Sequence, residues 1–153
     1  MELLYEELTK KIIGGLFEVH NELGPGFTEQ IYHQATLHEM ELRGLKTTTE
    51  KEYIVKYKDR EVGRYRTDII VEDKVLLELK AVSDLNENHE AQLISYLKAT
   101  GLKVGLLINF SKKRLEFRRF VYDELAAEFT KDGKQKYDLS AVSATSAVKE
   151  SHL

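Results

Sequence analysis

The sequence contains no cysteine, and this absence removes several kinds of chemistry at once. Disulfide bonds, zinc–thiolate sites and cysteine nucleophiles are excluded. No apolar run approaches the roughly 20 residues that a membrane-spanning helix needs. The first residues, Met1 to Glu7, also lack the basic segment and cleavage site of a secretory signal. We therefore expect a cytoplasmic protein with no membrane partner.

An excess of positive charge is missing as well. The 153 residues carry a formal net charge of −3, which gives a pI of about 6.0. Proteins that coat nucleic acid nonspecifically are usually strongly basic, because phosphate neutralisation supplies most of their affinity. A nucleic-acid enzyme of this composition would need its positive charge concentrated locally, with a bound metal ion offsetting part of an acidic site.

Hydrophobic periodicity and turn residues predict the helices. The first, over about 3–22, has one apolar face and ends at Gly24-Pro25-Gly26. Thr28 is expected to cap a second helix over about 29–43, with Glu29 in its first turn. A third is predicted over about 89–100, and a short one ends near Phe129.

Strands are predicted over about 52–57, 62–71, 74–81 and 104–109, with an optional fifth over 115–122. This order predicts an α/β fold: a three-layer α/β/α sandwich with a central mixed four-stranded sheet (α-β-β-β-α-β) plus an extra N-terminal helix. We expect residues 1–130 to form this domain. Residues 131–153 are polar and rich in small side chains, so they are predicted to be a flexible tail.

The register of the two middle strands predicts a site. If Glu72 to Lys74 form a three-residue loop, Val71 pairs with Val75 and Asp68 lies opposite Glu78. One face is then entirely apolar, and every charge in the strand interiors falls on the other face. The members of that second face are Arg64, Arg66, Asp68, Ile70, Leu76, Glu78 and Lys80.

Directly opposed carboxylates have Cβ atoms about 5 Å apart and repel one another unless a proton or cation lies between them. Their oxygens suit a hard divalent ion such as Mg²⁺ or Mn²⁺, and Lys80 on the same face could act on a water or a phosphate. The residues alone favour a simpler interpretation, a solvated sheet face with ion pairs. The expected central position of these strands, normally covered by helices, argues against it.

Several segments resemble a known family. Gly26 to Tyr32 matches the Gly-x-x-Glu-x-x-Tyr signature of the GxxExxY family, which is assigned to the PD-(D/E)xK nuclease superfamily. The similarity continues at Asp68 and through Glu78 to Val82, His89 to Leu97 and Thr100 to Phe110, and covers roughly residues 5 to 122. It departs from the superfamily pattern at Thr67, where proline is usual.

This resemblance implies roles for individual residues. Glu29, Asp68 and Glu78 become metal ligands and catalytic acids, Lys80 completes the (D/E)xK pair, and Gln92 is a helical glutamine near the site. Tyr32 and Tyr96 match family positions and, with Arg64 and Arg66, are predicted to bind substrate. From the residues alone, Gln92 is as well explained by a solvated position, and Glu29 with Tyr32 by a helix start packed against an aromatic ring.

Other charged residues have ordinary explanations. The histidines show no metal-ligand spacing, and His89 is expected to help start its helix. The basic cluster of Lys112-Lys113-Arg114 with Arg118 and Arg119 could contact phosphate, but a strand edge kept soluble by charge is the commoner use.

Three functions follow from these observations. The first is metal-dependent hydrolysis of phosphodiester bonds in nucleic acid, with DNA the expected substrate and a homodimer one way to grip a duplex. The second is a nuclease-fold module that binds nucleic acid or a protein without chemistry. The third is a metal-free acid–base enzyme of the glycosidase kind. Lys80 and the lack of an aromatic sugar platform argue against this third function.

Overall fold

The computed structural model describes residues 4–123 and 142–148. Its elements are α1 (Glu6–Leu23), α2 (Glu29–Leu42), β1 (Thr47–Thr49), β2 (Glu52–Tyr57), β3 (Arg60–Arg66), β4 (Ile69–Val71), β5 (Val75–Lys80), α3 (Glu87–Thr100), β6 (Val104–Asn109), β7 (Glu116–Tyr122) and β8 (Val142–Val148). None of the described helices is long and apolar enough to cross a membrane.

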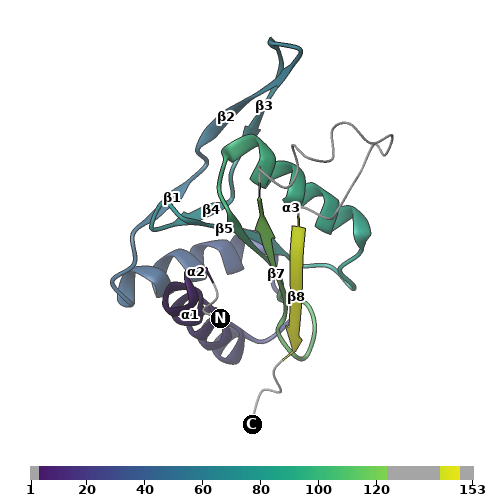
Figure 1. The fold of residues 1–153 in the computed structure, drawn as a ribbon. Coiled ribbons are helices and arrows are strands. Elements are labelled where there is room, and N and C mark those ends of the chain that lie inside the picture. The colour runs from purple at the N-terminus through teal and green to yellow at the C-terminus, as the bar shows by residue number, and fades with distance from the viewer. Residues whose placement is uncertain (1–3, 124–141, 149–153) are drawn as a thin grey trace.

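A mixed sheet with helices on both faces forms the centre of the fold (Figure 1). Its strands run in the order β1-β4-β5-β6-β7-β8, and β5 and β6, joined through α3, are parallel. The other neighbouring pairs are antiparallel. The predicted α/β sandwich with a mixed sheet is therefore confirmed, and the described sheet has more strands than the four predicted.

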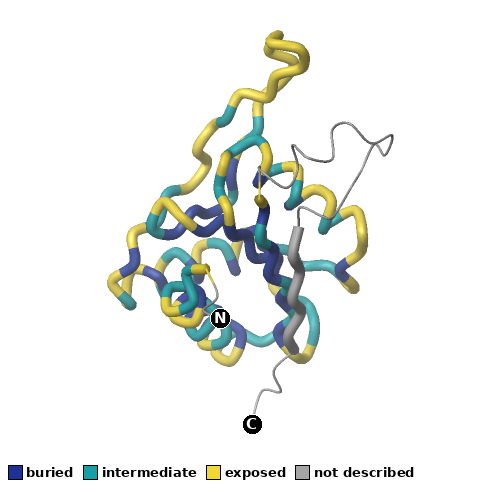
Figure 2. Tube along the Cα trace, viewed as in Figure 1, coloured by how far each residue is buried: buried dark blue, intermediate teal, exposed yellow. Residues whose placement is uncertain are grey.

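Alternation along β4 and β5 divides the interior into two cores. Ile69, Val71, Val75 and Leu77 pack with α1 and α2 on one face of the sheet. Ile70 and Leu76 pack with Leu93 and Leu97 of α3 on the other face. The predicted register is confirmed, because Val71 pairs with Val75 and Ile70 with Leu76 across the three-residue turn. Figure 2 shows the resulting buried centre.

The approach of α3 to the sheet depends on Gly105 in β6. A Cβ atom added at this position would lie 3.0 Å from Leu93 Cδ1 and 3.2 Å from Leu97 Cδ2, closer than most real contacts of that kind. Because Gly105 has no side chain, α3 packs directly against the backbone of β6.

The strand predicted over 62–71 is two strands. β3 ends at Arg66 and β4 begins at Ile69, with Thr67 and Asp68 between them. β3 pairs with β2 in a separate two-stranded ribbon, which projects from the body at the top of Figure 1. The prediction that 52–57 belongs to the central sheet is therefore wrong, and β1 occupies the edge beside β4 instead.

Two predictions concern the C-terminal part. The short helix expected to end near Phe129 lies outside the described residues. Part of the segment expected to be a flexible tail is a strand: β8 pairs antiparallel with β7. The composition argument considered only side-chain burial, whereas a strand can join a free sheet edge through backbone hydrogen bonds.

Candidate active site

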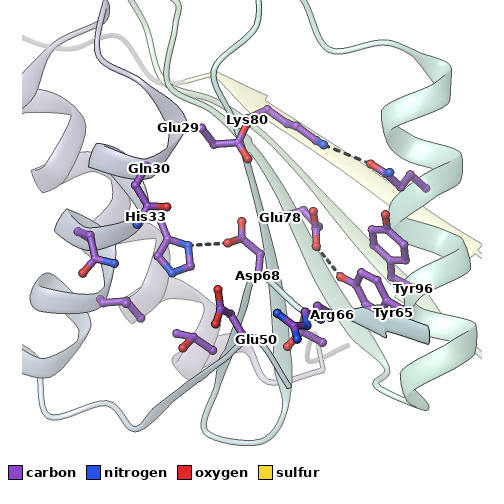
Figure 3. A pocket seen from close by; sticks show the side chains of 15 residues that line it. Glu29, Gln30, His33, Glu50, Tyr65, Arg66, Asp68, Glu78, Lys80 and Tyr96 are labelled. Atoms are coloured by element: carbon purple, nitrogen blue, oxygen red, sulfur yellow. Dashed lines mark hydrogen bonds and ion pairs between the residues drawn. The ribbon is translucent and has the colours of Figure 1, made fainter. Parts of the chain in front are cut away.

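A pocket of about 430 Å³ opens between α2, α3 and the end of the sheet where the ribbon begins (Figure 3). Glu29 reaches it from the first turn of α2, and Asp68 from the two-residue break between β3 and β4. Glu78 and Lys80 reach it from β5, where alternation places both on the same face. The fold thus brings together the three carboxylates predicted to form an acidic centre, with Lys80 beside them.

Asp68 is held by two hydrogen bonds. The backbone N–H of Leu79 donates to Asp68 Oδ2 at 2.9 Å, and His33 Nδ1 lies 2.5 Å from Asp68 Oδ1. The β4–β5 pairing begins at Ile69, so Asp68 lies just outside it. The Asp68 carboxylate accepts the Leu79 N–H bond that a backbone carbonyl would accept if the pairing continued. This bond fixes the carboxylate at the side of the pocket next to Glu78.

Glu78 is almost fully buried, with 8% of its surface exposed. The hydroxyl of Tyr65 donates to Glu78 Oε1 at 2.6 Å. The Tyr65 ring in turn stacks on Tyr96 of α3, with ring centroids 3.6 Å apart and an interplanar angle of 12°. The stacked pair therefore restricts the orientation of the carboxylate that the sheet carries.

The carboxyl groups influence one another electrostatically. Burial raises the pKa of Glu78 to about 7; the hydrogen bond from Tyr65 lowers it, and the negative charge of Asp68 raises it. The pKa of Glu29 is also raised, first by desolvation and then by Asp68, against the opposing effect of Lys80. Such mutual repulsion among oxygen donors is relieved by a proton or by a cation.

Lys80 and Gln92 interact across the pocket. Lys80 Nζ donates to Gln92 Oε1 at 3.2 Å, and Gln92 and Tyr96 lie one helical turn apart on α3, both lining the pocket. Gln92 thus lines the pocket and is also exposed to solvent, so both positions that the sequence left open describe it.

Tyr32 and Arg64 lie elsewhere. Tyr32 is completely buried, stacks on Phe110 at 4.5 Å and donates its hydroxyl proton to the carbonyl of Gly24. It fixes the turn that precedes α2, so a substrate-binding role is not supported. Arg64 forms ion pairs with Glu52 and Glu61 on the ribbon. Arg66 also contacts Glu52, and it lines the pocket.

The hydrogen bonds of Thr67 explain why proline, which is usual at this position in the superfamily, is absent here. Its backbone N–H donates to the carbonyl of Lys51 at 3.0 Å, and its side-chain oxygen accepts a bond from the N–H of Lys51 at 3.2 Å. Proline has no N–H and could not form the first bond. Thr67 therefore fastens the ribbon next to Asp68.

Sequence reasoning missed His33 and Tyr65 as contacts of the two central carboxylates. His33 follows Glu29 by four residues and so shares its helix face, which was a usable signal. Tyr65 carried no signal, because its contact depends on the turn of the chain at Thr67. Tyr65 and Tyr96 bring aromatic rings to the pocket, but the two rings are stacked on each other.

The basic cluster near the C-terminus is largely neutralised. Arg118 forms an ion pair with Glu90, and Lys112 pairs with Asp84 and Glu116 at 2.8 Å each. Arg119 is buried. His89 behaves as predicted, since it forms a capping box with Asn86 at the start of α3.

Comparisons with known proteins agree with this fold. The family model for the PD-(D/E)XK nuclease superfamily matches residues 6–120. No curated protein matches the chain. Among solved structures, "Crystal structure of SSO0001" superposes with a TM-score of 0.51 at 18% identity, covering 86% of this chain and 70% of that chain. At this identity the likeness shows the fold alone.

Proposed function

Because the chain belongs to the PD-(D/E)XK nuclease superfamily, we propose that it is a metal-dependent nuclease that hydrolyses phosphodiester bonds, with DNA as the expected substrate. The observation that supports this most is the gathering of Glu29, Asp68, Glu78 and Lys80 in one pocket. The narrower assignment to the GxxExxY family is compatible with the match and rests on the motif from Gly26 to Tyr32.

The donor set fits Mg²⁺ or Mn²⁺ in its chemistry. Glu29, Asp68 and Glu78 offer carboxylate oxygens, and their mutual repulsion would be offset by a divalent cation. Within the described residues, however, no three such side chains already stand close enough to hold a metal ion. Loading would therefore require side-chain movement, and Asp68 Oδ1 is the atom that His33 currently occupies.

The residues of the chain have distinct parts in the proposed reaction. A divalent ion, when bound, lowers the pKa of a coordinated water and polarises a phosphoryl oxygen. Tyr65 keeps the Glu78 carboxylate facing the pocket, and Leu79 N–H does the same for Asp68. Lys80, held by Gln92, supplies positive charge where negative charge develops on the phosphate.

Two groups that line the pocket, the exposed Arg66 and the half-buried Tyr96, would position the substrate. Arg66 lines the pocket at the end of β3 and is suited to a phosphate next to the scissile one. The Tyr96 ring lines the pocket from α3, where it is stacked on Tyr65. The pocket itself accommodates a reacting phosphate and leaves the rest of a polymer outside.

The decisive test is cleavage of single-stranded, duplex and branched DNA with Mg²⁺ and with Mn²⁺. We expect cleavage that EDTA abolishes and that Asp68→Ala and Glu78→Ala remove, while Glu41→Gln, an exposed change on α2, has no effect. Cleavage that survives both pocket substitutions would reject the assignment. Intact substrate in every assay, with salt-sensitive binding, would identify a noncatalytic module.

A further inference from the structure

The ribbon formed by β2 and β3 is far more exposed than the rest of the chain. We call residues 51–66 the arm. Every residue from 54 to 64 is exposed, and Figure 2 shows the end of the arm projecting away from the body. A two-stranded ribbon alone is marginally stable in water. The arm is ordered at its base, where Tyr53 and Tyr65 pack toward α3.

The exposed end carries large apolar side chains that the fold does not use. Ile54, Val55, Tyr57 and Val62 are exposed, and Tyr57 and Val62 show 64% and 60% of their surfaces. Half of the exposed large hydrophobic residues in the described chain lie on this short segment. Single exposed apolar residues are ordinary, and Ile54 and Val55 face opposite sides of the ribbon. Four of them on one short projecting element nevertheless indicate a segment that contacts a partner.

The charge of the arm indicates the kind of partner. The arm has six basic and three acidic residues, a net charge of +3, whereas the whole chain carries −3. Near the base, Arg64 and Arg66 form ion pairs with Glu52. Among the described residues, Lys56, Lys58 and Arg60 near the tip have no carboxylate partner. Cations without an ion pair are thus concentrated at the exposed end, where Lys58 Nζ lies over the Tyr57 ring, 5.5 Å from its centroid.

The arm is also continuous with the candidate active site. Tyr65 and Arg66 end its second strand, and both line the pocket that contains Asp68 and Glu78. The six residues of β2 span roughly 20 Å at strand geometry, the axial rise of about six nucleotides of a B-form strand. A polymer with one phosphate in the pocket has room to extend along the arm.

We infer that the arm binds the nucleic-acid strand beyond the pocket, with its cations on the phosphates and Tyr57 against an unpaired base. This inference rests on the proposed function and adds a substrate preference to it. Exposed aromatic rings interleaved with lysine and arginine bind single strands through base stacking and phosphate contacts. Substrates with unpaired nucleotides next to the scissile phosphate are therefore preferred to full duplexes of the same length.

Binding is measured by fluorescence anisotropy in EDTA, so that the result does not depend on cleavage. In the triple variant Lys56→Gln, Lys58→Gln, Arg60→Gln, affinity for a 30-nucleotide single strand falls about tenfold or more, and the slope of log affinity against log salt decreases by about two. In the matched control, the exposed Lys11, Lys98 and Lys103, which lie outside the arm and the pocket, are changed to glutamine. This control variant retains the wild-type affinity.

Substitutions of Tyr57 distinguish the contribution of base stacking from that of charge. Tyr57→Ala weakens binding of the single strand by about fivefold to a hundredfold, and Tyr57→Phe retains most of it. Equal affinity of the wild-type protein for a matched full duplex contradicts the stacking role. Protection of backbone amides in 54–64 from hydrogen exchange when the single strand is added provides a check that needs no variant.

The outcomes keep this inference separate from the proposed nuclease activity. If binding depends on the arm but no cleavage occurs, the binding role of the arm is supported and the nuclease activity is rejected. If cleavage occurs and the triple variant has unchanged affinity and KM, the nuclease activity is supported and the binding role of the arm is rejected. If Ile54→Ser with Val62→Ser instead abolishes a dimer seen by sedimentation and leaves nucleic-acid affinity unchanged, the arm is an interface between copies of the chain.

Discussion

Two neighbouring antiparallel strand pairs in this protein have opposite surroundings. The β4–β5 pair is buried on both faces, while the β2–β3 pair is exposed on both faces beyond its base. Only Thr67 and Asp68 separate the two pairs in sequence. The comparison teaches that the candidate catalytic groups lie where the chain passes from the exposed ribbon to the buried sheet. There Asp68 is bonded to the backbone of β5 at Leu79 and to His33 of α2.

The largest expected effect is on activity. Asp68→Asn keeps the hydrogen bond from Leu79 but removes the negative charge, and we expect cleavage to fall at least a thousandfold, beyond the losses of roughly a hundredfold that supporting residues cause. Arg64→Ala on the arm should change single-turnover cleavage of a short substrate less than threefold. Similar losses of cleavage for both variants would show that residues of the exposed pair matter as much for activity as Asp68 does.

Stability should distinguish the two pairs next. Leu77→Ala in β5 leaves a cavity in the fully buried core and should lower the free energy of unfolding by about 2–5 kcal/mol. Ile54→Ala in β2 removes a similar side chain from an exposed position and should cost less than about 0.5 kcal/mol. Urea denaturation of both variants provides the measurement. A large cost at Ile54 would mean that the arm is covered in solution.

Glu78 should make stability depend on pH. Its pKa is about 7 in the folded protein and near 4.5 in the unfolded chain. Between these values the folded protein retains a proton that the unfolded chain releases, so stability is greatest at acid pH and falls as the pH rises through 7. Glu78→Gln should therefore stabilise the protein at pH 8, by up to about 3 kcal/mol, and have little effect near pH 4.5.

Thermal unfolding at both pH values tests this, with Glu41→Gln as an exposed control. Addition of Mg²⁺ at pH 8 should raise the Tm of the wild-type protein and have a smaller effect on Glu78→Gln, because a ligand of the folded state stabilises it. If Glu78→Gln is instead less stable at pH 8, interactions within the fold already offset the cost of burying the charged carboxylate.

The smallest effect concerns the link between the two pairs. Tyr65→Phe keeps the ring stacked on Tyr96 and removes the hydrogen bond to Glu78, so activity should fall tenfold to a hundredfold. That bond lowers the pKa of Glu78, so its loss should also move the rising limb of the pH–activity profile to higher pH. A loss of activity without this displacement would indicate that Tyr65 acts only through packing.

Much of this arrangement could be predicted from the sequence. The apolar alternation of β4 and β5 fixed the register, because a shift by one residue would have buried charge, and the continuous apolar run of β6 indicated a central strand. That register placed Asp68, Glu78 and Lys80 on one face, and the resemblance to the superfamily added Glu29 to the candidate site. All of these rest on local periodicity or on a motif.

The remainder depended on tertiary structure. Alternation in β2 and β3 describes a strand pair equally well inside or outside the main sheet, so it could not reveal the arm. The short strand β1 consists of three threonines and has no apolar signal. Tyr32 matched a family position, but only the structure shows that the match reflects packing against Phe110.

The close approach of α3 to β6 at Gly105 connects a buried position to one wall of the pocket. Gln92 and Tyr96 stand on the helix beside Leu93 and Leu97, the two side chains that meet Gly105. A methyl group added at 105 would require these side chains or their helix to yield by a few tenths of an ångström. A shift of the helix would carry Gln92 and Tyr96 with it, so a buried substitution would reach the pocket without altering any residue that lines it.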